Sequence, residues 1–129
     1  GEIPVSILTN FSGHPYWLIR KIAIEHITKS NSEDTVEYLH AFRKVKYFRS
    51  HELIRNYLFK RLQDGSLKYD EAVVAVDLLS CLASVDGISE AVGRKDRDLC
   101  TKIATAYGIV EKNMVQSDIV DKSADTIME

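Results

Sequence analysis

Apolar side chains recur every three to four residues along most of the chain, which is the spacing of amphipathic α-helices. No segment shows a convincing alternation of apolar and polar residues, the pattern typical of a β-strand. The pattern predicts helices over residues 15–29, 33–48, 50–64 and 69–85. It also predicts a short helix over 88–92 that stops at Gly93, a charged turn over 93–96, a longer helix ending near Gly108 and a last amphipathic piece. We therefore expect an all-α chain of about six to seven helices.

The helix over residues 70–85 is apolar around almost its whole circumference. Valine, leucine and alanine fill most of its positions, and only Asp77, Ser80 and Ser84 share a narrow polar strip. A helix of this kind that is too short to span a bilayer has to be enclosed by other helices. We therefore expect antiparallel helical hairpins packed in a small superhelix or bundle around this central buried helix.

The composition is that of one ordinary globular domain. The chain has 129 residues, of which 45% are hydrophobic and 28% charged, and it contains no low-complexity linker. We expect a single helical domain over 1–129, with an N-terminal loop or short helix over 1–14, a helical core over 15–116 and a frayed tail over 117–129. No signal peptide or membrane span is recognisable. Cys81 and Cys100 each lie in an apolar helical pattern, which favours buried thiols in a reducing compartment. Together these features predict an intracellular, cytoplasmic protein.

Positive charge is concentrated in one stretch. The whole chain has a net charge of −2, whereas residues 42–62 contain seven basic residues against the single acid Glu52, with aromatic residues interleaved. On helical projection part of this set falls on the solvent side of the second predicted helix. A tight turn would place the rest on an adjacent ridge. The candidate binding residues are His40, Arg43, Lys44, Lys46, Tyr47, Arg49, Arg55 and Lys60.

A basic and aromatic surface of this kind suits an anionic partner. Phosphates of RNA, an inositol lipid head group or an acidic peptide would all fit. A pI near 6.1 argues against a general nucleic-acid binder, whose pI usually exceeds about 9. The competing interpretation is a solvated face that balances acidic residues elsewhere. Of the aromatic residues, Tyr47 is expected to be exposed, and Phe48 and Tyr57 to lie in the core.

No catalytic, metal-binding or phosphate-binding motif is present. The four histidines have no i, i+4 pair, and the sequence contains no CxxC, HExxH or GxxxxGK[ST]. We expect surface or half-buried histidines, and we expect Asp96 and Asp98 to complement a helix N-terminus. The sequence therefore predicts a protein that is not an enzyme and that has no metal and no cofactor.

The rhythm of consecutive antiparallel helices resembles small right-handed α-superhelices of HEAT or armadillo type, and is similar to the compact ENTH and VHS adaptor domains. The resemblance covers residues 15–116. Its only local sequence similarity is the segment 58–62, which leads into the apolar helix at 70–85. No functional residue carries over. The resemblance implies a scaffold or adaptor that binds a protein partner, either a peptide in a helical groove or another subunit's surface. The alternative is RNA or anionic-lipid binding through residues 43–61, and the oligomeric state is left open.

Overall fold

The computed structural model describes residues 3–30, 33–45 and 47–109. Within these residues the chain forms six α-helices and no strand, so the all-α prediction is confirmed. The last predicted amphipathic piece beyond residue 109 and the tail over 117–129 lie outside the described residues. The helices are α1 (Val5–Ser12), α2 (Trp17–Lys29), α3 (Thr35–Phe42), α4 (Ser50–Gln63), α5 (Tyr69–Ala83) and α6 (Glu90–Tyr107).

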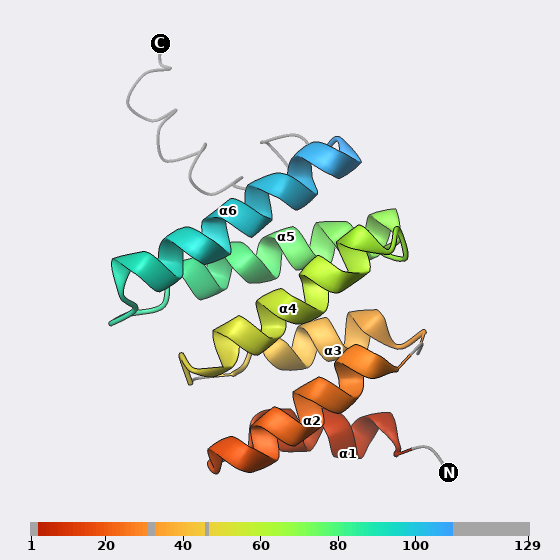
Figure 1. Ribbon diagram of the computed structural model, residues 1–129, viewed down its shortest axis with the longest axis vertical. Helices are drawn as coiled ribbons and strands as arrows, with labels where there is room; N and C mark the ends of the chain where they lie inside the picture. The colour runs from red at the N-terminus through yellow and green to blue at the C-terminus, as the bar shows by residue number, and fades with distance from the viewer. Residues whose placement is uncertain (1–2, 31–32, 46, 110–129) are drawn as a thin grey trace, which may run out of the picture.

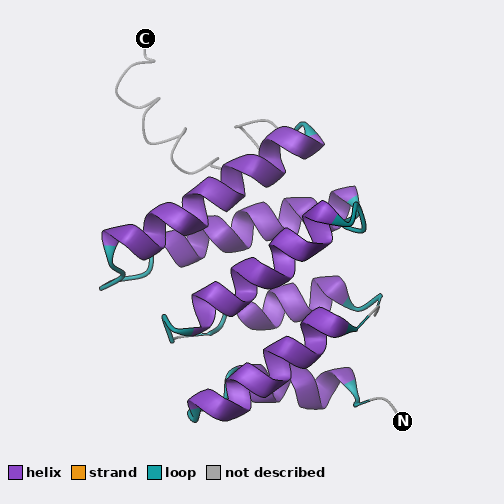
Figure 2. Cartoon of the chain, viewed as in Figure 1, coloured by secondary structure: helices purple, strands orange, loops and turns teal. Residues whose placement is uncertain are grey.

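The helices are stacked in two layers (Figure 1). One layer contains α1, α3 and α5, and the other contains α2, α4 and α6, with neighbours in each layer in contact. Each helix runs antiparallel to the one before it, so the helices within a layer are parallel. The helix ends consequently gather at two edges (Figure 2). At one edge α1, α3 and α5 end and α2, α4 and α6 begin; at the other edge α2 and α4 end and α3 and α5 begin.

The core lies between the two layers. Ile24, Ile27, Leu39, Ile54 and Leu79 are completely buried, and each such side chain contributes about 1.5–3 kcal/mol to folding. The cluster also takes in residues from every one of the six helices. Packing between layers, rather than helix propensity alone, therefore holds these short helices in place.

The helix α5 is largely buried, but it lies within a layer. It packs between α3 and α6, and Val73, Val74 and Cys81 on its other side are half-buried. The expectation that surrounding helices enclose it completely is therefore not confirmed. None of the helices in the described part of the chain is long and apolar enough to cross a membrane.

The second predicted helix is shorter than expected. It ends at Phe42 rather than at residue 48, because the amides of Lys44 and Val45 bond to carbonyls three residues back and tighten the chain into a turn. The bend changes the direction of the side chains that follow. Phe48, predicted in the core, is 38% exposed and its ring lies against His51. Tyr57 is buried as predicted.

The charged segment around Gly93 is helical, not a turn. The helix α6 begins after Ser89, whose hydroxyl accepts from the Val92 amide at 3.2 Å, and continues unbroken to Gly108. A Cβ atom at Gly93 would lie 3.3 Å from the Ala83 carbonyl oxygen. The glycine therefore allows close approach of α6 to the end of α5, which is a packing role and not a helix-stop role.

Candidate functional site

The basic residues predicted to form one ridge are divided among several surroundings. Three of the cations form ion pairs with carboxylates. Two of these carboxylates lie on neighbouring helices, and the third lies one turn after its cation, at the end of α4. These pairs contribute no free positive charge to the surface. The pairs are Arg43–Asp77, Arg55–Asp96 and Lys60–Asp64.

Two further members of the set, His40 and Lys44, are exposed side chains on and just after α3. Lys44 lines a hollow beside Thr9 and Asn10 of α1. Lys46 lies outside the described residues. His40 and Lys44 are thus available to a partner, on a different layer from the helix that carries Arg55.

The remaining two members, Tyr47 and Arg49, meet side chains of α2. The guanidinium carbon of Arg49 lies 4.2 Å from the centroid of the Trp17 ring. The guanidinium carbon of Arg20 lies 3.9 Å from the Tyr47 ring centroid and 5.5 Å from that of Trp17. Cations and aromatic faces therefore alternate, an arrangement stabilised by cation–π attraction. We call Trp17, Arg20, Tyr47 and Arg49 the arginine–aromatic edge.

Arg20 is a buried cation without a carboxylate. Its side chain is only 4% exposed. Its Nε donates to the Ser50 hydroxyl at 3.0 Å, and one Nη donates to the carbonyl oxygens of His14 and Pro15 at 2.9 Å each. Among the described residues neither Arg20 nor Arg49 forms an ion pair. Within the described part of the chain, no carboxylate offsets the positive charge of this edge.

The sequence analysis missed Arg20 and Trp17. Arg20 precedes Ile24 and Ile27 by four and seven residues, so it falls on the same buried face of α2. A charged residue at a buried helical position was the available signal. Its closer aromatic partner, Tyr47, comes from the turn before α4, which helical projection alone does not place.

A second polar centre joins α4 to α6. Asp96 is completely buried, and its Oδ1 accepts from Arg55 at 2.7 Å while its Oδ2 lies 2.9 Å from Nδ1 of His51. The prediction that Asp96 complements a helix N-terminus is wrong, because α6 is not interrupted near Gly93. The prediction of surface or half-buried histidines is wrong for His51, which is 1% exposed.

The geometry of this centre favours a structural link. Nδ1 of His51 faces Oδ2 of Asp96, and Nε2 is the second ring nitrogen. That Nε2 is buried and has no hydrogen-bond partner among the described residues. Because Nε2 is sealed from solvent, it offers no contact to a substrate. The cluster therefore connects α4 and α6.

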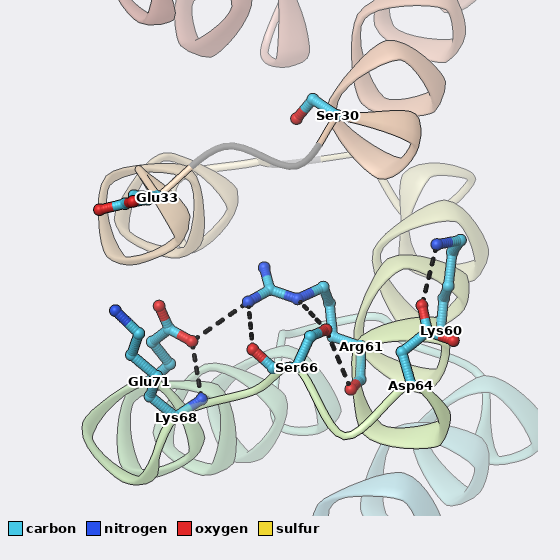
Figure 3. A pocket seen from close by; sticks show the side chains of 8 residues that line it. All are labelled: Ser30, Glu33, Lys60, Arg61, Asp64, Ser66, Lys68 and Glu71. Atoms are coloured by element: carbon cyan, nitrogen blue, oxygen red, sulfur yellow. Dashed lines mark hydrogen bonds and ion pairs between the residues drawn. The ribbon is translucent and has the colours of Figure 1, made fainter.

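The opposite edge of the stack has a polar cavity of about 400 Å³ (Figure 3). Arg61 extends toward Ser66 and Glu71, donating to the Ser66 carbonyl at 2.6 Å and to Glu71 at 3.3 Å. Glu71 also accepts from the Lys68 amide at 2.8 Å. Three basic and three acidic side chains line the cavity, so its charge favours neither an anionic nor a cationic ligand. The lining residues are Ser30, Glu33, Lys60, Arg61, Asp64, Ser66, Lys68 and Glu71.

The two thiols are protected. Burial raises the pKa of both Cys81 and Cys100 above the usual thiol value, so the reactive thiolate is disfavoured. Cys100 also directs its Sγ to the Val76 carbonyl at 3.5 Å. Both cysteines are free, in agreement with the expectation of unpaired thiols. Within the described residues no group of histidine, cysteine and carboxylate side chains could hold a metal ion.

An apolar groove of about 370 Å³ runs between α1 and α2 at one end of the stack. Ile3, Ile7 and Phe11 form one wall at four-residue spacing and are 41–43% exposed. Ile22, which is 67% exposed, stands on the opposite wall. The lining residues are Ile3, Ile7, Leu8, Phe11, Ile19, Ile22, Ala23 and His26.

The apolar spacing that predicted a helix over residues 15–29 did not separate the faces of that helix. Ile24 and Ile27 are indeed buried, whereas Leu18 and Ile22 are 66% and 67% exposed. At 100° per residue Leu18 and Ile22 project away from Ile24 and Ile27, so α2 has two apolar faces and only one is covered. A stripe wider than one core face was the signal that could have revealed the groove.

The other end of the stack, formed by α6, is polar. Its exposed residues are mainly charged residues or threonines, including Arg97, Thr101 and Thr105. In the described part of the chain α6 exposes no large apolar side chain. The two ends of the stack therefore differ in character.

Comparisons with protein-family models, with curated proteins and with solved structures found no significant match.

Proposed function

We propose that this protein is a non-enzymatic helical interaction domain that binds a protein partner by receiving a partner helix in the groove between α1 and α2. The observation that carries this proposal is the exposed apolar groove itself. Contiguous apolar patches of this kind on a protein surface mark interaction sites. Covering Ile7 and Ile22 alone would contribute roughly 1–2 kcal/mol each.

The shape of the groove supports a helix as the bound element. One wall follows i, i+4, i+8 spacing along residues 3, 7 and 11, and the other follows i, i+3, i+7 spacing along residues 19, 22 and 26. Two such ridges leave a furrow into which the ridge of a third helix packs. The stacking of antiparallel hairpins in two layers is also what a HEAT- or armadillo-like scaffold or adaptor would have.

The test compares wild-type protein with Ile7→Glu, Ile22→Glu and Arg49→Glu in binding to a partner isolated on the wild-type chain. A carboxylate in the groove should abolish binding, whereas Arg49→Glu should leave it unchanged. Hydrogen exchange of the complex should show new protection on α1 and α2. Binding that survives Ile22→Glu, or protection confined to other helices, would contradict the proposal.

A second candidate function is the binding of an anionic partner at the arginine–aromatic edge. It is favoured by Arg20 and Arg49, which have no carboxylate among the described residues, and by the exposed Lys44. Phosphate groups are the shared chemistry of the two ligands expected from the sequence, RNA and anionic lipid.

This second function is tested with single-stranded RNA and with vesicles containing anionic lipid. Binding should weaken steeply as salt rises, and should be lost in the Lys44→Glu/Arg49→Glu variant but kept in Ile22→Glu. Binding that is independent of salt, or unaffected by the double charge reversal, would exclude it.

A further inference from the structure

We infer that the partner received by the α1–α2 groove is a second copy of this chain, and that two copies meet through this face as a two-fold symmetric dimer. The inference rests on the proposed function, since it names the occupant of the same groove. Three properties of the surface support it: the difference between the two ends of the stack, the relief of the face and its charge.

The difference between the ends excludes one way of pairing. Stacking copies head to tail would press Ile7 and Ile22 of one copy against the α6 end of the next, where Arg97 and Thr101 are exposed. That contact would desolvate charged groups without providing partners for them. Among the described residues, the surface that matches the apolar end of one copy is the apolar end of another, and two identical patches meet through a two-fold axis.

The shape of the α1–α2 face, a ridge beside a groove, is self-complementary. Leu18 and Ile22, one helical turn apart, form a ridge that is 66–67% exposed. The groove lies directly beside this ridge, because Ile22 also lines it. A two-fold rotation reverses the order of ridge and groove, so the ridge of each copy faces the groove of the other.

The charge of the face permits contact between identical surfaces. A strongly charged patch repels its own copy, but here the flanking charges Lys21 and Glu25 neutralise each other at 3.3 Å within one helix. The other ionisable groups on this face are His26, which lines the groove, and the exposed Lys29 at the C-terminal end of α2. One uncompensated lysine is too little charge to prevent contact between identical faces.

The exposed area is large enough for association. Six large apolar side chains of the first two helices and their flanking residues are about half exposed on average: Ile3, Ile7, Phe11, Tyr16, Leu18 and Ile22. At about 200 Å² per side chain they expose on the order of 600 Å². This approaches the roughly 800 Å² per partner of a standard interface.

The experiment measures the mass of the full chain by sedimentation equilibrium under reducing conditions, from low micromolar to about 100 µM. We expect a concentration-dependent dimer. Ile7→Glu and Ile22→Glu should each weaken dimerisation by on the order of 100-fold, because an unpaired carboxylate would be buried. Thr101→Glu, at an exposed site of the polar end, should leave it unchanged. Circular dichroism should show that all three variants remain helical.

Mixing distinguishes the symmetric dimer from any head-to-tail contact. If both copies use the same face, every mixed dimer of wild-type protein with Ile22→Glu contains one carboxylate in the interface and should be weaker than the wild-type dimer. If they used different faces, the variant would bind wild-type protein through its intact end with undiminished affinity. A chain that stays monomeric at about 100 µM, or a mixed dimer as tight as the wild-type dimer, would overturn the inference.

The inference and the proposed function can fail separately. A monomeric chain that binds a different protein in a manner sensitive to Ile22→Glu would overturn the dimer and retain the groove as a docking site. A dimer that is insensitive to both groove substitutions would overturn the inference alone, because the groove would still be open to a different protein.

Discussion

The two sides of α4 bury charge in opposite ways. Toward α6 the carboxylate of Asp96 lies between Arg55 and His51, so the buried anion has basic groups on both oxygens. Toward α2 the guanidinium of Arg20 has no carboxylate in the described structure, and its donors go to a hydroxyl and two carbonyl oxygens. The aromatic faces of Trp17 and Tyr47 cover it.

The difference teaches that a count of basic residues does not measure surface charge. Arg55 belongs to the basic stretch, yet its charge is neutralised by Asp96, which is distant in sequence. Arg20 lies outside that stretch, yet it adds a cation that no described acid neutralises. A buried cation is tolerated here because its hydrogen bonds are made and π systems replace a counter-ion.

The largest effect is expected from removing the carboxylate on the α6 side. Asp96→Ala leaves Arg55 and His51 without their acceptor in a buried position, so unfolding free energy should fall by about 3–5 kcal/mol. Urea denaturation measures this loss. Asp98→Ala, an exposed site on the same helix, serves as the matched control and should change stability by less than about 0.5 kcal/mol. Similar stability of the two variants would show that the link between α4 and α6 is dispensable.

A smaller loss is expected on the α2 side. Arg20→Met keeps much of the apolar stem but removes three hydrogen bonds and the contacts with the two rings, so we expect a loss of about 2–3 kcal/mol. Lys21→Met is its neighbour control; it removes only the exposed pair with Glu25, worth less than about 1 kcal/mol. If Arg20→Met were instead more stable than wild type, desolvation of the cation would outweigh its contacts. The two sides of α4 would then differ in that burying Arg20 lowers the stability of the fold, whereas burying the paired Asp96 does not.

A third contact of α4, toward α3, gives the smallest effect and a dependence on pH. Burial raises the pKa of Tyr57, although its hydroxyl donates to Thr35 and accepts from Arg61 at 3.1 Å. The folded state therefore holds this proton more strongly than the unfolded chain. Its contribution to stability is complete below about pH 10 and is lost as the pH rises above it.

Chemical denaturation between about pH 9 and pH 11 tests this contribution. Wild-type protein should lose about 1 kcal/mol more than Tyr57→Phe over this range, while Cys81 and Cys100 affect both proteins equally. Tyr69→Phe, at a 54% exposed site, should behave like wild type. A wild-type curve parallel to that of Tyr57→Phe would contradict the assignment.

The fold class was predictable because the helical period depends on residues close in sequence. Tyr57 was placed correctly on this basis. The errors arose where the chain leaves a regular helix or where a residue has two possible roles. Phe48 was misplaced because the turn after Phe42 was not foreseen, and Gly93 was interpreted as a helix stop when it serves close packing with α5.

The candidate site was less predictable, since its features depend on contacts between distant segments. The spacing of 41 residues between Arg55 and Asp96 and of 29 between Arg20 and Arg49 carries no local signal. The exposed face of α1 and α2 was hidden for a different reason. Apolar periodicity shows that a face is hydrophobic, but only the packing of the other helices shows whether that face is covered.

The position of Trp17 gives the molecule a built-in optical probe. It is the chain's only tryptophan, and it is flanked by two guanidinium groups, one of them on the segment just before α4. Any event that separates α2 from that segment must change the polarity around a single indole. Its emission spectrum therefore reports the opening of this one edge, separately from the melting of the helices.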